Sequence, residues 1–262
     1  MRVGQTIGVI LLLACGALTA LAQTTVVRAS RVVDAKPGDV RVLATAAIRE
    51  PLNAVLKQAE AVIGTSIVVE YGGARGNLKD EILKGQDFEI AILLPDVNDE
   101  LQAAGKITPG RFEIARVPVA FGLRGEAPGL DVSSPAAVKS ALLKAKSVKY
   151  APNGAALMTV KKILSSLDIA KAIRDSSRVD GEVPLALGEY EINIYPMSEV
   201  IPNRRLKNLG AVISQLQVPV ILEAVVGKSA ADSKKAYALI DFLQGPSVDQ
   251  ALKDDGMERV GK

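Results

Sequence analysis

Two stretches decide the fold: FEIARVPVAFGL at residues 112–123 and QVPVILEAVV at residues 217–226. Both are long apolar runs typical of strands, each contains a proline, and each is followed by a change of structural unit. We therefore expect the chain to cross from one α/β unit to another near Val117 and to return near Val220. The alternative is a single doubly wound sheet with two edge strands.

Around these runs, short strands alternate with helices. The pattern predicts strands at 40–44, 66–71, 89–93, 147–150, 177–179 and 191–195. It predicts helices at 50–63, 77–84, 135–144, 154–167, 232–244 and 247–254. Short apolar strands separated by helices are typical of a mainly parallel sheet that is covered on both faces.

The first residues predict export. Arg2 precedes an apolar run at residues 7–22, which is too short for a comfortable transmembrane helix and ends in the small-x-small motif Ala20-Leu21-Ala22. We expect residues 1–22 to be a cleavable signal peptide and the mature protein to be periplasmic. The alternative, a lipoprotein-type cut before Cys15, leaves a very short apolar core in the leader.

The composition excludes several kinds of chemistry. The chain has no His and no Trp, and its one cysteine lies in the predicted leader. Disulfides, zinc sites of the usual Cys/His type and Ser-His-Asp hydrolysis are therefore excluded from the mature protein. We predict no cofactor and no metal. The net charge of +3, which becomes +2 without the leader, is too close to neutral for a nucleic-acid partner.

Several motifs resemble those of periplasmic molybdate-binding proteins. They are VLATAAI at 42–48, YGGARGNL at 71–78, LKGQDFEIAI at 83–92, APNG at 151–154, IY at 194–195 and FLQGP at 242–246. The resemblance covers nearly the whole mature chain. It implies an α/β, two-lobed periplasmic binding protein type II fold, in which each lobe is a mainly parallel sheet flanked by helices and two crossover strands join the lobes. Lobe 1 is expected at 23–117 and 220–262, and lobe 2 at 118–219.

Two departures from the family pattern bear on the ligand. The resemblance implies an oxyanion held by two serine hydroxyls and backbone N–H groups, but Ala47 stands at the first serine position and Arg75-Gly76 near the second, with Thr45 close by. The guanidinium of Arg75 offers a fork suited to a carboxylate. Arg49 is poorly placed for the helix dipole, so it either contacts the ligand or lies on a solvated helix face.

Lobe 2 contributes to the same predicted site. Asn153 and Gly154 are expected to open a helix whose N–H groups suit an anion, and Tyr195 corresponds to a binding tyrosine of the family. The predicted substrate-binding residues are Thr45, Ala47, Arg49, Arg75, Gly76, Asn153, Gly154 and Tyr195. If the protein is an enzyme, Tyr195 is the expected base and Arg75 its cationic partner; Glu70 and Glu182 are alternative bases.

Cations at these positions imply a ligand with more than one carboxylate. The family includes a periplasmic enzyme that interconverts trans- and cis-aconitate, so the resemblance implies an aconitate isomerase that performs a 1,3-proton shift between the lobes. The alternative is the solute-binding protein of an ABC importer for an organic polycarboxylate or a molybdate-like oxyanion, with a permease as its partner. We expect a monomer.

Overall fold

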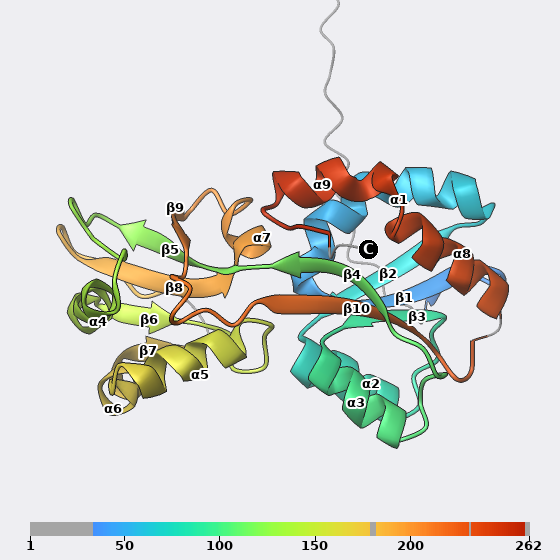
Figure 1. The fold of residues 1–262 in the computed structure, drawn as a ribbon, viewed down its shortest axis with the longest axis horizontal. Coiled ribbons are helices and arrows are strands. Elements are labelled where there is room, and N and C mark those ends of the chain that lie inside the picture. The colour runs from blue at the N-terminus through green and yellow to red at the C-terminus, as the bar shows by residue number, and fades with distance from the viewer. Residues whose placement is uncertain (1–33, 179–181, 231, 260–262) are drawn as a thin grey trace, which may run out of the picture.

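The computed structural model describes residues 34–178, 182–230 and 232–259. Within these ranges the strands form two five-stranded sheets, and each sheet is the centre of one lobe (Figure 1). Lobe 1 carries the two ends of the described chain, and lobe 2 is the other lobe. The predicted signal peptide, residues 1–22, lies outside the described residues.

Lobe 1 is built on a sheet with the strand order β2-β1-β3-β10-β4. Its strands are β1 (Val40–Thr45), β2 (Ile67–Gly72), β3 (Ile90–Leu93), β4 (Phe112–Val117) and β10 (Val220–Val226). Its helical elements are η2 (Ala46–Ile48), α1 (Arg49–Ile63), η3 (Ala74–Leu78), α2 (Lys79–Leu83), α3 (Pro95–Ala103), α8 (Ser233–Leu243), η4 (Pro246–Val248) and α9 (Asp249–Asp254). Helices α1, α8 and α9 cover one face of the sheet, and α2 and α3 cover the other (Figure 1).

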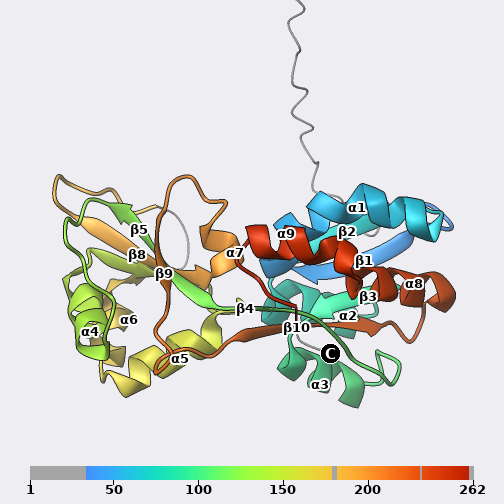
Figure 2. The same ribbon diagram turned by 45° about the horizontal axis from the view of Figure 1, so that its top comes forward.

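Lobe 2 has the strand order β7-β6-β8-β5-β9. Its strands are β5 (Val119–Gly125), β6 (Ser147–Lys149), β7 (Ser177–Arg178), β8 (Tyr190–Pro196) and β9 (Lys207–Ala211). Its helices are α4 (Pro135–Lys144), α5 (Leu157–Ser166), α6 (Ala170–Ser176) and α7 (Met197–Val200). Of these, α7 lies at the edge that faces lobe 1 (Figure 2).

The two long apolar runs cross between the lobes, as predicted. The first run is two strands in two sheets, because the chain leaves lobe 1 at the end of β4, passes Pro118 and enters lobe 2 as β5. The second run returns as β10, where Val220 is paired with Val117.

Both sheets are mixed, which differs from the expected mainly parallel arrangement. In lobe 1, β1 is parallel to β2 and β3, whereas β10 is antiparallel to β3 and β4. In lobe 2, β6 is parallel to β7 and β8, whereas β5 is antiparallel to β8 and β9. The strands that come from the crossings, β5 and β10, run opposite to the strands that are followed by helices. Each antiparallel pair among these strands therefore contains β5 or β10.

One side chain joins the two crossings. Gln217 Nε2 donates to the carbonyls of Val119 (2.9 Å) and Val212 (3.1 Å), and Gln217 Oε1 accepts from the Val119 N–H (3.0 Å). Thr159 of α5 adds a second link, since its hydroxyl donates to Val218 O (2.8 Å) and accepts from Val218 N (3.0 Å). These bonds supply backbone partners where the strands have left their sheets.

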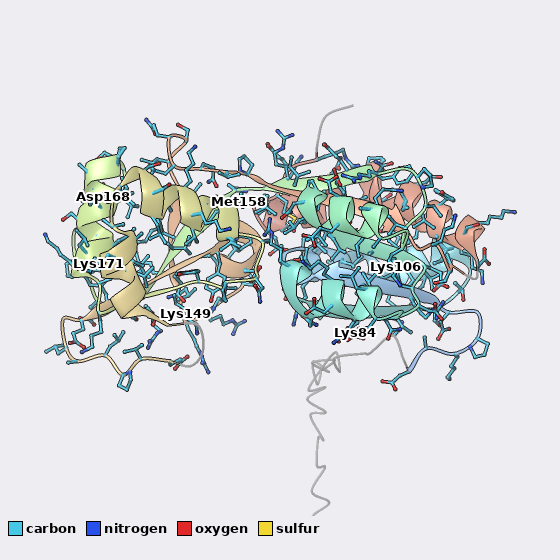
Figure 3. The ribbon with its side chains drawn as sticks, turned by 90° about the horizontal axis from the view of Figure 1, so that it is seen from below. Lys84, Lys106, Lys149, Met158, Asp168 and Lys171 are labelled. Carbon is cyan, nitrogen blue, oxygen red and sulfur yellow. The ribbon has the colours of Figure 1, made fainter. Side chains whose placement is uncertain are left out.

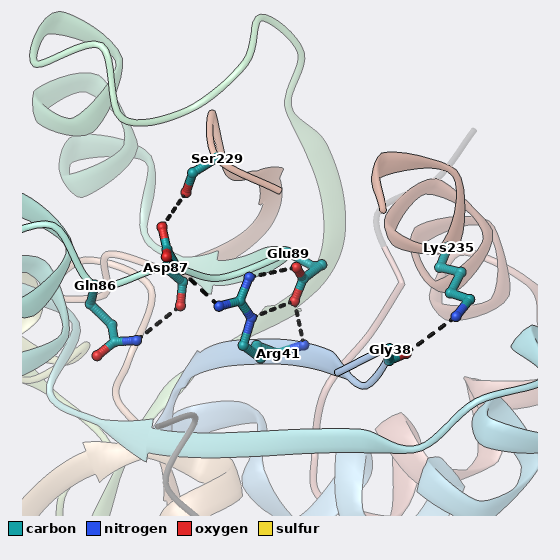
Figure 4. A network of polar contacts seen from close by, with 7 residues as sticks. All are labelled: Gly38, Arg41, Gln86, Asp87, Glu89, Ser229 and Lys235. Carbon is teal, nitrogen blue, oxygen red and sulfur yellow. Dashed lines mark hydrogen bonds and ion pairs between the residues drawn. The ribbon is translucent and has the colours of Figure 1, made fainter. Parts of the chain in front are cut away.

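A buried ion pair fixes the start of β1 against the start of β3. Glu89 is 2% exposed and accepts from the Arg41 N–H (2.7 Å), Nε (2.9 Å) and Nη2 (2.7 Å) (Figure 4). A buried carboxylate is stable only when it is paired in this way. The pair holds the register of the two strands and so the position of the loops that follow their opposite ends.

Some short elements differ from the prediction. The pattern does not predict α3, α6, α7 or β9; α7 and β9 are too short to show a period, and α3 buries only Val97, Asn98 and Leu101. Helix α5 begins at Leu157 rather than at Gly154, because the Gly154 N–H closes a turn on Ala151 O (3.1 Å). No helix within the described ranges is long and apolar enough to cross a membrane.

Candidate functional site

The candidate site lies where loops that follow strand ends in both lobes meet. Two side-chain hydrogen bonds join the lobes there. One connects the segment after β1 to the segment after β8, from Ser198 Oγ to Ala47 O at 2.7 Å. The other connects the segment after β2 to the segment after β6, from Arg75 Nη1 to Gly154 O at 2.8 Å. Four of the predicted site segments are therefore brought together.

The segment after β1 presents backbone rather than hydroxyl groups. Ala47 is 1% exposed, and its carbonyl is the acceptor for Ser198. Thr45, also buried, sits at the start of η2, but its side chain caps no helix N–H. The resemblance implies a serine of lobe 1 at position 47. In the structure the hydroxyl at this place belongs to Ser198 of lobe 2, and it donates to the backbone carbonyl of Ala47.

The guanidinium of Arg75 is occupied by a carboxylate of the chain itself. Its Nε and Nη2 donate to the two carboxylate oxygens of Asp96 at 2.6 and 3.0 Å. Asp96 lies in the first turn of α3, an element that the sequence pattern does not predict. Arg75 therefore does bind a carboxylate through two nitrogens, but that carboxylate belongs to Asp96. The third nitrogen of Arg75, Nη1, donates to Gly154 O of lobe 2.

Gly76 and Asn153 lie against each other across the two lobes beside this ion pair. A Cβ on Gly76 would lie 3.4 Å from Asn153 Cβ. The Arg75 N–H donates to Asn153 O at 3.3 Å. The Gly154 N–H, which we expected to face an anion, donates to Ala151 O. The predicted N–H cradle after β6 is therefore partly used within its own turn.

Arg49 differs from Arg75. It is exposed in the first turn of α1, and its guanidinium lies 4.9 Å from the centre of the Tyr71 ring, a cation–π contact. The Tyr71 hydroxyl donates to Asn53 Oδ1 at 2.8 Å, which holds the ring against α1. Among the described residues, no carboxylate lies within ion-pair distance of Arg49. Its charge is available to a ligand.

Tyr195 and the two alternative bases are placed differently. Tyr195 is half-buried near the end of β8, opposite Ala120, and has an interaction partner of its own. Glu70 is buried within β2 and also has a partner. Glu182 is exposed and pairs with Arg205 at 2.5 Å. The role of Tyr195 stays a prediction, and Glu182 belongs to the surface of lobe 2.

Glu199 is a candidate that the sequence analysis does not identify. It lies on α7, next to Ser198 and four residues after Tyr195. Desolvation raises the pKa of Glu199 to about 7, and the nearby charge of Arg49 opposes this rise only in part. Perturbed carboxyl groups of this kind gather at functional sites. The only sequence signal is an acidic residue just after the binding strand.

A cavity of about 210 Å³ opens between the lobes on the α3 side. Its walls are apolar except for the Arg75–Asp96 pair, and they include Met158, which lies at the edge of lobe 2 (Figure 3). Its remaining lining residues are Leu94, Pro95, Ala155, Val218, Pro219, Val220 and Ile221. Within the described part of the chain, no group of three His, Cys, Asp or Glu side chains is arranged to hold a metal ion.

Comparison with known proteins identifies relatives of two kinds. The chain is 26% identical over 231 residues to the molybdate-binding protein ModA of Azotobacter vinelandii, which covers 85% of this chain and 90% of that protein. It is 21% identical over 257 residues to an aconitate isomerase of a Pseudomonas species, which covers 95% of this chain and 96% of that protein.

The fold and the family agree. The solved structure of the periplasmic molybdate-binding protein of A. vinelandii is similar with a TM-score of 0.65 and 18% identity, covering 85% of this chain and 100% of that one. This likeness supports the two-lobed periplasmic binding protein fold. The sequence model of the bacterial extracellular solute-binding protein family matches residues 40–258 of this chain. The chain therefore belongs to the bacterial extracellular solute-binding protein family.

Proposed function

We propose that this protein is exported, binds a small organic polycarboxylate between its two lobes and delivers it to an ABC importer. Family membership supports the binding role, and the predicted leader at residues 1–22 supports export. The two-lobed fold suits closure around a small ligand.

The proposed ligand class rests on one observation, which is the positive charge of Arg49 and its lack of an ion pair among the described residues. Its guanidinium stands at the first turn of α1, beside Ala47, where the resemblance implies a serine, and no ion pair within the described chain neutralises it. A tetrahedral oxyanion held by neutral donors does not need such a cation. A second carboxylate on an organic ligand does, because a charge-assisted bond to it contributes about 1.5–3 kcal/mol.

Calorimetry with a ligand panel tests the proposal. We expect trans-aconitate, cis-aconitate or citrate to bind more tightly than molybdate or sulfate. Replacing Arg49 by Gln should weaken binding of the tricarboxylate by about tenfold or more, since one charge-assisted bond is lost. Binding of molybdate alone, with no response to any tricarboxylate, would overturn the proposal.

Lys57→Gln is the matched control for Arg49→Gln. Lys57 is on the same helix, its side chain is 93% exposed, and among the described residues its ion pair is with Glu60. Its loss changes the net charge by the same amount without touching the space between the lobes. Equal weakening by both variants would show that net charge, rather than a contact of Arg49, determines the affinity.

Isomerase activity is the second candidate function. Similarity to an aconitate isomerase over 95% of the chain favours it. In that case Arg75 and Tyr195 remain the predicted catalytic residues, with Arg75 acting together with Asp96. Incubation with trans-aconitate and chromatography of the products tests this candidate: formation of cis-aconitate supports it, and unchanged substrate in the presence of bound protein contradicts it.

A further inference from the structure

Arg75 belongs to lobe 1, but it donates two hydrogen bonds to the backbone of lobe 2. Its N–H donates to Asn153 O at 3.3 Å, and its Nη1 donates to Gly154 O at 2.8 Å. These acceptors are successive carbonyls of the turn that precedes α5. One residue of lobe 1 therefore holds this turn through both its main chain and its side chain.

The segment that carries Arg75 does not fix the side chain by itself. Arg75 lies in the short element η3, which contains Gly76, whose φ of −115° and ψ of −121° are not helical. A long arginine side chain on such a segment has many rotamers, and ordering it costs free energy. Another group must therefore hold the guanidinium in place.

Asp96 supplies that support. Its carboxylate accepts from Arg75 Nε at 2.6 Å and from Arg75 Nη2 at 3.0 Å, and such a bidentate pair fixes the plane of the guanidinium. The third nitrogen, Nη1, is thereby directed to Gly154 O. The Arg75 side chain is 15% exposed and the Asp96 side chain is 51% exposed, so the arginine is enclosed while its partner lies at the surface of lobe 1.

Asp96 is itself held by lobe 1. It lies in the first turn of α3, where the helix dipole favours a negative charge. Two other acids of this helix, Asp99 and Glu100, form ion pairs with other parts of lobe 1 at 2.6 and 2.8 Å. The orientation of Arg75 is therefore set by the lobe to which it belongs.

The same ion pair is the charged part of the cavity of about 210 Å³ between the lobes. The rest of the lining is apolar and includes Met158 of lobe 2 and Pro219 of the returning crossing. A guanidinium without a partner beside such walls would be unfavourable, because burial of an unpaired charge costs free energy. Asp96 removes this cost and so allows Arg75 to lie between the lobes.

We infer that Asp96 is a positioning residue for closure of the lobes: it directs the Arg75 guanidinium to the backbone of lobe 2 and away from the carboxylates of a ligand. This inference rests on the proposed binding of a polycarboxylate. Arg49 remains the cation that meets the ligand, and Arg75 contributes to affinity by holding the lobes together. The sequence alone predicts a different use of Arg75, which is direct contact with the ligand.

Calorimetry with two ligands that differ by one carboxylate separates these uses of Arg75. The dicarboxylate trans-glutaconate is trans-aconitate without its central carboxylate. A contact between the lobes affects both ligands alike, so Arg75→Gln should weaken binding of both by about tenfold. Asp96→Asn should weaken both by about fivefold. The double variant should bind about as weakly as Arg75→Gln, because Asp96 acts through Arg75.

The distance between the lobes gives a second readout, which needs no ligand. The one cysteine of the chain lies in the predicted leader, so spin labels can be attached to the mature protein at Lys57→Cys in lobe 1 and Leu187→Cys in lobe 2. Both positions are highly exposed. Double electron–electron resonance should show longer distances in Arg75→Gln and in Asp96→Asn than in the labelled parent protein.

Asp99→Asn is the matched control. Asp99 is on the same helix as Asp96, and its ion pair with Arg111 at 2.6 Å lies within lobe 1. This variant should leave the affinities and the distances unchanged. Asp96→Glu keeps the charge on a longer side chain and should recover part of the affinity that Asp96→Asn loses.

Three results would overturn the inference. They are a loss of affinity in Arg75→Gln for trans-aconitate but not for trans-glutaconate, tighter binding in Asp96→Asn, and unchanged distances in both variants. The first would mean that Arg75 meets the ligand directly, and the second that Asp96 competes with the ligand. Absence of binding of either ligand to the unaltered protein would overturn the proposed function instead, and the distances between the labels would still decide the inference.

Discussion

Arg75 and Arg49 are the same residue type near the same junction, yet they have different partners. Arg75 is bound by Asp96, which lies 21 positions away along the chain, whereas Arg49 has an aromatic ring and a desolvated carboxyl group beside it. Arg75, Gly76, Asn153 and Gly154, which are four of the predicted site residues, lie close together in the structure, and their role in binding stays a prediction. The sequence pattern cannot identify Asp96 as a partner, because ion pairs depend on neighbours in space and α3 shows too few apolar residues to be predicted.

Glu199 was beyond sequence reasoning for a related reason. Its environment results from α7 lying against η2, and a four-residue helix has no period to detect. An acidic residue in such a segment is normally a solvated one. The desolvation that raises its pKa comes from the elements that pack around α7 in the folded protein.

The pH dependence of stability follows from this shift. The pKa of Glu199 in the folded protein, about 7, lies above its ordinary value of 4.5, so the folded state holds this proton to higher pH. The contribution is fully present below about pH 4.5 and is lost as the pH rises through about 7, by at most about 3 kcal/mol. We expect Glu199→Gln to raise the melting temperature by roughly 5 °C at pH 8 and to leave it nearly unchanged at pH 4.5.

Thermal unfolding monitored by circular dichroism at both pH values is the measurement. A lower melting temperature for Glu199→Gln at pH 8 would contradict the prediction, because it would mean that Glu199 is ionised there and stabilised by Arg49. Glu189→Gln is the control. The pKa of Glu189 is lowered, chiefly by the Ala186 N–H and by Lys146, so its loss should not stabilise the protein at pH 8.

At the scale of elements, periodicity predicts the long helices and the central strands well. Helix α1 buries Leu52, Val55 and Ala59 on one face and ends at Gly64, whose φ of 70° is the left-handed conformation that favours glycine at a helix end. The start of α5 differs because Gly154 and its neighbours form turns that compete with the helix. Propensity alone does not decide between these two arrangements.

Gly227, which follows β10, must be a glycine because a neighbouring segment leaves no room for a side chain. A Cβ on Gly227 would lie 2.3 Å from the carbonyl oxygen of Phe88, a backbone atom that cannot move without disturbing the start of β3. We expect Gly227→Ala to lower the free energy of unfolding by about 1–3 kcal/mol, as measured by urea denaturation. In Gly73→Ala the nearest atom, Asn77 Oδ1, is 3.6 Å away, so the change should stay within about 0.5 kcal/mol. Equal losses in the two variants would show that close packing at Gly227 is not the cause.

At the scale of the whole molecule, the two proline-containing runs predict where the chain passes between the lobes. What they do not predict is how the passages are held together. Gln217 bonds the backbone of Val119 in one crossing while it belongs to the other. Gln217 and Val119 lie 98 residues apart along the chain, so no local pattern contains this link. It ties the two passages to each other.

Closure of the lobes around a ligand requires contacts between them, and Ser198 supplies one of the two side-chain hydrogen bonds that join the lobes at the site. Its hydroxyl belongs to lobe 2 and its acceptor, Ala47 O, to lobe 1, so opening of the lobes breaks the bond. We expect Ser198→Ala to weaken binding of the tricarboxylate by about fivefold, since about 1 kcal/mol of closure energy is lost. Calorimetry gives the change in Kd.

Ser165→Ala is the control for Ser198→Ala, because it also removes a serine hydroxyl but leaves the contact between the lobes intact. Its hydroxyl is exposed on α5 and donates to Lys162 O at 3.2 Å within the same helix, so lobe motion does not affect it. If closure determines affinity, Ser198→Ala should also reduce the ligand-induced decrease in radius of gyration measured by small-angle X-ray scattering, whereas Ser165→Ala should not. Unchanged affinity and compaction in Ser198→Ala would place the closing contacts elsewhere, and the bond from Arg75 to Gly154 would then have to hold the lobes together.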